Sequence, residues 1–427
     1  MRKNLYKILE NAKWSSVHSW SFIAFSLGMT LEAYIFGMSS IATNWVPMPR
    51  FLESLLLAWS PLWLIIGIIF TGPLSDKLGR KRMFYLTMSL YAIGAVGITF
   101  AYTYYLILTF LAMLLFAAGG EMNTIMVMTH EIMPSKHRSK TMFFEINFIN
   151  FGGLLLAAVA LSSAYSSVAF QRFMIGVTAI IIIVVLAYAR SKIPESIRWL
   201  EEKGDLDKAE EEIRKHFNFV EDTNTATVDR KVEKLPPISL RLAVSIIMAT
   251  ANTIGFGLMT YVAGPYFFPK LTATIILVAS IAEFLAGLGI SPFADIISRR
   301  LILLISFMGT VASTAVIYFT IPYWTSNLIL FWILLIVLNV FTSISYLSED
   351  TLKGELWPTS RRGTYTAIVR FVSIGAYIPA IFLTAGLTIS QYMLFNLSVW
   401  SLGLVASIVW FIKGIETGKG RSLSEFS

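Results

Sequence analysis

Twelve apolar runs, each about 20 residues long, constrain this 427-residue chain more than any other feature. A membrane-spanning helix needs about 20 mostly apolar residues, whereas barrel strands are shorter and alternate apolar with polar side chains. With 56% hydrophobic and 14% charged residues, the chain is too apolar for a water-soluble globule. We therefore predict an all-α integral membrane protein. Its spans are 20–43, 54–74, 83–101, 104–128, 141–163, 168–189, 239–264, 271–293, 301–321, 327–348, 363–386 and 391–412.

Lys and Arg are distributed unevenly between the two sides of these spans. The two terminal segments and the loops after even-numbered spans hold 30 of the 34 basic residues, and the loops after odd-numbered spans hold three: Arg50, Arg172 and Lys270. Basic residues concentrate on the cytoplasmic side. We therefore expect a multi-pass protein of the cell (plasma) membrane, surrounded by the lipid bilayer, with cytoplasmic N- and C-termini. Because the basic residues lie between apolar runs and form no single face, we expect no nucleic-acid partner.

Two motifs occur once in each half of the chain, in the same order and at nearly the same offset. Gly72 to Arg82, around Asp76, reappears as Ser291 to Arg300 around Asp295. Glu131 with its following Pro and Arg reappears at Glu355. Parallel six-helix repeats are a known transporter plan, with the substrate site at mid-membrane between them. We expect a six-helix bundle over 1–189, a cytoplasmic linker with short helices over 190–238, and a second bundle with a short tail over 239–427.

The motifs carry a family resemblance. The stretch from Gly72 through Asp76, Gly79 and Arg80 resembles the Gly-x-x-x-Asp-x-x-Gly-Arg-Lys/Arg motif of the major facilitator superfamily. The run Pro-Glu-Ser-Ile-Arg-Trp-Leu at 194–200 resembles a motif of its sugar-porter and organic-ion and metabolite:H⁺ symporter branches. The resemblance implies two pseudo-symmetric six-helix bundles, a central cavity lined by spans 1, 4, 7 and 10, and charged clusters that gate the cytoplasmic end. The gating role would fall on Asp76, Gly79, Arg80, Glu131, Arg138, Glu195, Arg198, Asp295, Arg299, Glu355 and Arg362. The alternative is that these charges only fix the topology.

Ionisable residues inside the spans are the candidates for binding. A charge in the bilayer costs about 2.5–3.5 kcal/mol on insertion scales, so each one suggests a function. The five are Glu32, Glu121, Glu145, Glu283 and Arg370. A desolvated carboxyl group can take up a proton near neutral pH. The family resemblance, which lines the cavity with spans 1 and 4 among others, implies that Glu32 and Glu121 lie in it. Asn252 and Tyr346 complete the predicted substrate and proton site.

Arg370 is the residue that best distinguishes between possible substrate classes, because it stays charged at any ordinary pH and needs a negative partner. It is either a counter-charge for an anion or one half of an ion pair with Glu145 or an acid of span 2 or 10. The paired glutamines that sugar porters carry in span 7 are missing from 247–254. We therefore predict a secondary active transporter of a small organic solute, with an organic acid slightly preferred and a hexose or pentose as the alternative.

The remaining expectations concern coupling and partners. The transporter is expected to be coupled to protons, with Na⁺ the other possibility, and to act as a monomer. The chain has no cysteine, no metal-binding motif and no nucleotide-binding loop, so we expect no cofactor, no metal and no enzymatic activity. A non-transporting nutrient sensor with the same fold is the alternative from another class.

Overall fold

The computed structural model describes residues 12–163, 166–217, 235–357 and 362–417. All regular structure in these ranges is helical, and twelve segments are long and apolar enough to cross a membrane. The expected fold class and number of spans are therefore confirmed. Most helix ends lie within a few residues of the expected boundaries. Span ten is the exception, because its helix continues beyond residue 348 to Glu355.

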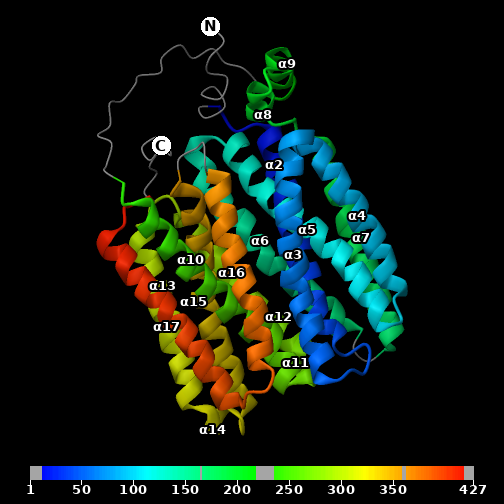
Figure 1. The fold of residues 1–427 in the computed structure, drawn as a ribbon, viewed down its shortest axis with the longest axis vertical. Coiled ribbons are helices and arrows are strands. Elements are labelled where there is room, and N and C mark those ends of the chain that lie inside the picture. The colour runs from blue at the N-terminus through cyan, green and yellow to red at the C-terminus, as the bar shows by residue number, and fades with distance from the viewer. Residues whose placement is uncertain (1–11, 164–165, 218–234, 358–361, 418–427) are drawn as a thin grey trace.

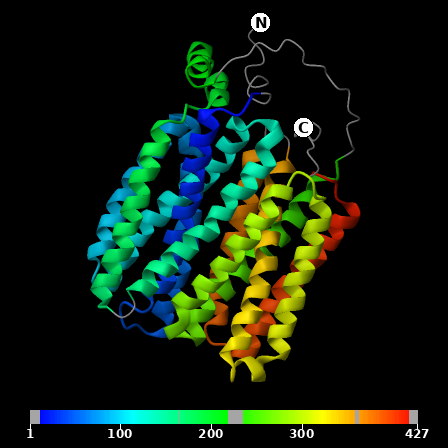
Figure 2. The same cartoon turned by 180° about the vertical axis from the view of Figure 1, so that it is seen from behind.

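Six long helices form the first half of the molecule. They are α2 (Ser16–Ala42), α3 (Arg50–Leu78), α4 (Arg80–Phe100), α5 (Tyr104–Ile132), α6 (Arg138–Ser162) and α7 (Val168–Ser191). The single turn η1 (Ser135–His137) joins α5 to α6. Within this half α3 packs along α5, and α2 packs along α6. Figures 1 and 2 show these blue to green helices on one side of the molecule.

The second half repeats this plan with one composite span. Its first span consists of α10 (Ile238–Gly257), the π-helical turn η2 (Leu258–Val262) and α11 (Ala263–Phe267). A π-turn inside an α-helix often marks a functional site. The turns η3 (Pro269–Leu271) and η4 (Ser291–Phe293) flank α12 (Thr272–Ile290). The remaining helices are α13 (Arg299–Phe319), α14 (Ile321–Trp324), α15 (Leu328–Glu355), α16 (Arg362–Thr384) and α17 (Ile389–Lys413).

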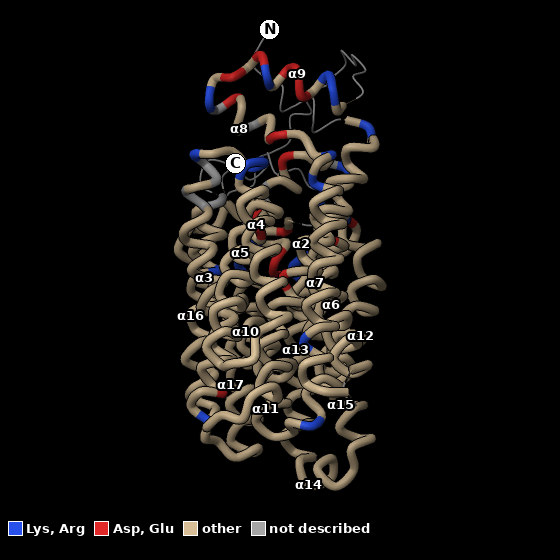
Figure 3. The backbone as a smooth tube through the Cα atoms, turned by 90° about the vertical axis from the view of Figure 1, so that its right-hand side faces the viewer, with Lys and Arg blue, Asp and Glu red and all other residues tan. Residues whose placement is uncertain are grey.

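Two short helices, α8 (Ile197–Glu202) and α9 (Leu206–His216), follow the first half. They lie beyond one end of the long helices, where most charged residues gather (Figure 3). Ala209 and Ile213 on α9 are buried, so this helix packs against the protein through an apolar stripe. We call this end of the molecule the α8–α9 end and the opposite end the α14 end.

Small residues bring the helix backbones close together inside the first half. A side chain at Gly119 on α5 would collide with the backbone of α3 at Leu64. Gly152 on α6 lies in the same way against the backbone of Thr30 on α2. Close packing through small residues is a main source of helix association in membranes, where the hydrophobic effect does not drive it. These contacts hold the helices of the first half close together.

Candidate functional site

A small cavity lies between the two halves. About 60 Å³ of it is open to the centre of a water molecule, which is room for a few waters. The first half contributes residues from α2, α3, α5 and α6, and the second half contributes residues from α10, η2, α15 and α16. The lining consists of Glu32, Ala33, Phe36, Leu64, Met122, Ile149, Thr253, Phe256, Gly257, Tyr261, Tyr346, Ile374 and Tyr377. The cavity is therefore assembled by helices that only the tertiary fold brings together.

The lining combines one carboxyl group with a set of aromatic rings. Glu32 is the one acidic residue of the lining and is only 7% exposed. The ring of Tyr261, in the π-turn, lies 5.4 Å from the ring of Phe36 and 5.4 Å from that of Phe256. Tyr346 packs against Phe256 at 6.1 Å. The cavity thus offers flat apolar surfaces, several hydroxyl groups and a single ionisable carboxyl.

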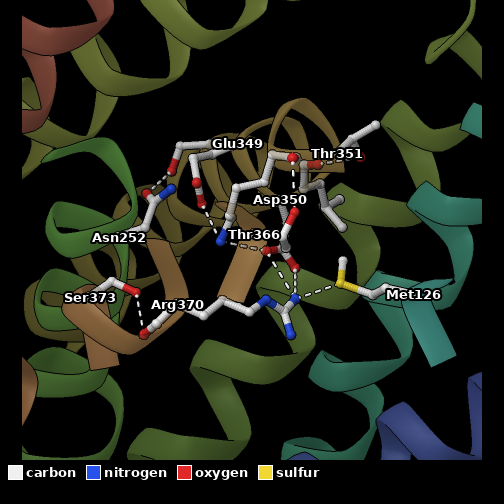
Figure 4. A network of polar contacts seen from close by, with 11 residues as sticks. Met126, Asn252, Glu349, Asp350, Thr351, Thr366, Arg370 and Ser373 are labelled. Atoms are coloured by element: carbon white, nitrogen blue, oxygen red, sulfur yellow. Dashed lines mark hydrogen bonds and ion pairs between the residues drawn. The ribbon is translucent and has the colours of Figure 1, made fainter. Parts of the chain in front are cut away.

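A buried set of charges separates the cavity from the α8–α9 end. We call Glu349, Asp350, Lys353 and Arg370 the α15–α16 charge cluster (Figure 4). The Lys353 ammonium lies 2.7 Å from the carboxylate of Asp350 and 3.2 Å from that of Glu349. The Arg370 guanidinium lies 3.3 Å from both oxygens of Asp350. All four side chains are at most 6% exposed, so each charge depends on its neighbours for compensation.

The cluster lies one helical turn beyond the cavity lining. Asp350 follows the lining residue Tyr346 by four residues on α15, and Arg370 precedes Ile374 by four on α16. Four residues correspond to about 6 Å along a helix. Nη2 of Arg370 also lies 2.6 Å from the sulfur of Met126 on α5. The cluster therefore contacts the first half across the boundary between the halves.

Arg370 was expected to be either a counter-charge in the cavity or one half of an ion pair. It is absent from the lining and pairs with Asp350, an acid on the helix of span ten. Its Nε and Nη1 atoms are buried and have no hydrogen-bond partner among the described residues. The sequence did not point to Glu349, Asp350 and Lys353, because its apolar run ends before them.

Glu121 lies elsewhere than expected. Its carboxylate forms a two-point ion pair with Arg190 on α7, with 2.6 Å between Nη2 and Oε2, and it accepts a hydrogen bond of 2.5 Å from Thr87 on α4. Arg190 also lies over the ring of Phe84, 4.1 Å from its centroid. Glu121 is thus absent from the cavity lining, because a guanidinium inside the first half binds it.

Asn252 and the buried acids Glu145 and Glu283 also lie outside the cavity lining. The side-chain oxygen of Asn252 accepts a hydrogen bond of 2.7 Å from Ser345 on α15. Glu145 accepts one of 2.6 Å from Thr129. Both carboxyl oxygens of Glu283 on α12 are buried without a hydrogen-bond partner in the described part of the chain. Of the five predicted substrate and proton residues, Glu32 and Tyr346 line the cavity.

At the α8–α9 end, Glu195 caps the start of α4. Its carboxylate accepts hydrogen bonds from the backbone N–H groups of Arg80 at 3.1 Å and Lys81 at 3.2 Å. Gly79 precedes them with a φ of 93°, a conformation that favours glycine. A side chain there would meet Glu195 and Trp199. A carboxylate at a helix N-terminus is favourable because it compensates unpaired N–H groups and the helix dipole.

The second half contains an equivalent arrangement around Glu416. Its carboxylate accepts bonds from the backbone N–H of Arg299 at 2.7 Å and from the hydroxyl of Ser298. Arg299 in turn lies 3.3 Å from Glu355 and 4.8 Å from the ring of Phe143 on α6. Glu416 follows Glu195 at nearly the offset that separates Asp295 from Asp76, so the repeat could have identified it from the sequence.

The other predicted gating residues lie near the same end. Glu131 accepts a hydrogen bond from Ser196. Arg138 is buried and donates to the backbone oxygen of Met133 at 3.3 Å. Asp295 lies in the turn between η4 and α13. The side chains of three predicted residues lie outside the described part of the structure: Asp76, Arg198 and Arg362.

The two halves also touch at the α14 end. Arg50 at the start of α3 lies 3.8 Å from the ring centroid of Tyr266 and donates to the backbone oxygens of Tyr266 at 3.3 Å and Ala385 at 3.1 Å. The Ser54 hydroxyl lies 2.9 Å from that of Tyr266. Contacts between the halves thus occur on both sides of the cavity, at Arg50 and at Arg299. We call this arrangement, in which the halves are in contact on both sides of the cavity, the closed arrangement.

Twelve apolar helices of the described ranges, arranged in two similar halves around a central cavity, are the plan of a membrane transporter. Residues 14–378 match the sequence model of the Major Facilitator Superfamily, so the chain belongs to this family of transporters and is not an enzyme.

Individual relatives transport sugars and other metabolites. The glucose transporter GlcP of Staphylococcus epidermidis is 26% identical over 441 residues, covering 95% of each chain. The niacin transporter NiaP of Acinetobacter baylyi is 26% identical over 203 residues, 47% of this chain and 44% of that protein. The structure of the proton:xylose symporter XylE bound to 6-bromo-6-deoxy-D-glucose aligns with a TM-score of 0.77 at 17% identity, over 96% of this chain and 98% of that one. This structural likeness shows a shared fold.

Proposed function

We propose that the protein is a secondary active transporter that moves a small organic acid by alternating access, coupled to protons. The observation that carries the proton coupling is the position of Glu32, the one acid in the cavity lining. A carboxyl group in an apolar cavity takes up a proton readily, because burial disfavours its charged form. Protonated Glu32 would favour the closed arrangement around a bound substrate. Release of the proton from Glu32 would accompany opening.

The preference for an organic acid rests on Arg370 and on the aromatic lining. Buried polar groups are nearly always satisfied, yet Nε and Nη1 of Arg370 have no partner among the described residues. A substrate carboxylate that reached past Tyr346 would supply one. The rings of Phe36, Phe256 and Tyr261 would pack on a flat apolar body.

Transport in proteoliposomes tests this proposal. The purified protein is reconstituted and offered radiolabelled nicotinate, glucose or xylose, with and without an imposed pH gradient. We expect gradient-driven nicotinate accumulation that falls at least tenfold in Glu32→Gln while substrate exchange persists. The exposed α9 variant Glu211→Gln is the matched control and keeps wild-type accumulation. Accumulation in Glu32→Gln equal to that of the wild type would refute the proton role of Glu32.

A sugar is the second candidate. It is supported by the likeness to GlcP along 95% of both chains and by the hydroxyl groups of Thr253, Tyr261 and Tyr377 in the lining. Uptake of glucose or xylose that is unaffected by Arg370→Ala would overturn the organic-acid proposal. Absence of uptake for every solute, with binding retained, would favour a sensor.

We also propose that the α8–α9 end faces the cytoplasm, that the membrane is the plasma membrane, and that the monomer is the transporting unit. The concentration of basic residues at this end supports the orientation. The cavity lies within one chain and draws residues from both of its halves, which supports a monomer. Replacing the pH gradient by a Na⁺ gradient in the same vesicles distinguishes the two coupling ions.

A further inference from the structure

The α15–α16 charge cluster is balanced on its own. It contains two carboxylates, Glu349 and Asp350, and two cations, Lys353 and Arg370, joined by contacts of 2.7–3.3 Å. A buried ion costs several kcal/mol unless another charge compensates it. With all four groups ionised the net charge of the cluster is zero, so the cluster needs no further charge to be electrically neutral.

Glu32 is a fifth ionisable group beside this balanced set. The charged groups that act on its carboxyl are Arg370, Asp350 and Glu121, and Glu121 is already neutralised by Arg190. The other titratable groups around it are the phenols of Tyr91, Tyr261 and Tyr346. Ionised Glu32 therefore leaves one uncompensated negative charge in a site with room for only a few waters, and protonated Glu32 leaves none.

Arg370 is the group that both carboxylates can share. Its Nη2 contacts Asp350 on α15, and its Nε and Nη1 have no partner within the described ranges. The guanidinium fork has five donors and can bind carboxylates from two directions. Asp350 and an ionised Glu32 thus compete for the same cation from opposite halves of the molecule.

We propose that Asp350 is a positioning residue that holds Arg370 away from Glu32 and thereby keeps the proton on Glu32 in the closed arrangement. When the α8–α9 end opens, Glu32 releases its proton to water. Arg370 then turns toward the new carboxylate and leaves both Asp350 and the sulfur of Met126. This inference rests on the proposed proton role of Glu32 and adds the residue that controls it.

Charge counting predicts opposite effects for the two partners of the pair. In Asp350→Asn, Arg370 has no carboxylate of its own, so it stabilises ionised Glu32 and the proton is lost at lower pH. In Arg370→Gln the cluster already carries one excess negative charge, so Glu32 holds its proton to higher pH. The double variant Asp350→Asn/Arg370→Gln restores the balance through Glu349 and Lys353, and returns Glu32 toward wild-type behaviour.

Infrared difference spectroscopy on the full-length protein in lipid vesicles measures this directly. The protonated carboxyl band of Glu32 is isolated by subtracting the spectrum of the same protein carrying Glu32→Gln at each pH. We expect the proton affinity of Glu32 to fall at least tenfold in Asp350→Asn, to rise in Arg370→Gln and to return within threefold of wild type in the double variant. Asp350→Glu, which keeps the charge, and Glu211→Gln on α9 should match the wild type.

Shifts in the same direction for the two single variants, or a double variant that behaves like Asp350→Asn, would overturn the inference. A purely structural role for Asp350 would not produce opposite shifts. If the shifts occur as expected but no pH gradient drives uptake in the wild type, the proposed function fails and the control of Glu32 by Asp350 stands.

Discussion

The ion pair between Glu121 and Arg190 provides a sharp test of how the first half is held together. Both side chains are at most 4% exposed, and the carboxylate also binds Thr87 on α4. Replacing Glu121 by Gln keeps the size of the side chain and one acceptor oxygen. It removes the negative charge and leaves the Arg190 guanidinium buried without a counter-charge.

The size of the effect follows from the burial of this pair. Removing one partner of a buried ion pair costs about 3–5 kcal/mol. Because Gln still accepts a hydrogen bond, we expect the lower value, about 3 kcal/mol. This corresponds to a factor of about 100 in the unfolding equilibrium. The double variant Glu121→Leu/Arg190→Met removes both charges, and we expect it to recover most of the loss.

Denaturant titration in detergent micelles, followed by circular dichroism, measures this loss. The matched control is Asp205→Asn, at the residue just before α9, where the pair with Lys208 is 2.5 Å long but its side chains are 37% and 69% exposed. An exposed pair contributes about 0–1 kcal/mol. A loss for Glu121→Gln no larger than that of the control would refute the reasoning. A stable Glu121→Gln variant that no longer responds to a pH gradient would assign the proton site to Glu121.

Two further predictions concern the closed arrangement and the packing within the first half. Ser54→Cys introduces the only thiol of the chain, and a polar maleimide reports how accessible it is. In this background Arg50→Ala should raise the labelling rate about fivefold, because about 1 kcal/mol of contact at the α14 end is lost. An unchanged rate would contradict the role of Arg50 in closing that end. Gly119→Ala should lower the melting temperature by several degrees, because the new methyl group collides with the backbone of α3. The control Gly289→Ala should not lower it, because no atom lies within 4 Å of the added carbon. Equal melting temperatures for the two variants would show that α3 and α5 can move apart.

Much of the architecture could be predicted from the sequence, and the reason is physical. Only helices of about 20 apolar residues satisfy their backbone hydrogen bonds inside a bilayer, so length and hydropathy determine the spans. The repeat between Asp76 and Asp295 revealed two similar halves. Glu32 could be placed near mid-membrane because the depth of a residue in a helix follows from its distance to the loop, and the family resemblance placed its span beside the cavity.

Depth along a helix does not determine which neighbour a side chain faces. Glu32 and Glu121 were equivalent candidates by depth, yet one lines the cavity and the other binds Arg190, 69 residues away in the chain. Several helices surround each span, and a rotation of about 100° per residue decides which of them a carboxylate meets. That choice depends on the packing of the whole bundle.

The α15–α16 charge cluster is a second feature that the sequence alone could not predict. A hydropathy count ends span ten at its last apolar residue, because Glu349, Asp350 and Lys353 would be costly in lipid. The helix continues through Asp350 and Lys353 because Lys353, and Arg370 on α16, compensate the negative charges of Glu349 and Asp350. The sequence by itself determined that the protein spans a membrane as two repeated bundles. Only the tertiary structure decided which buried charges meet, because a buried charge is stabilised by partners that the fold brings in from other helices.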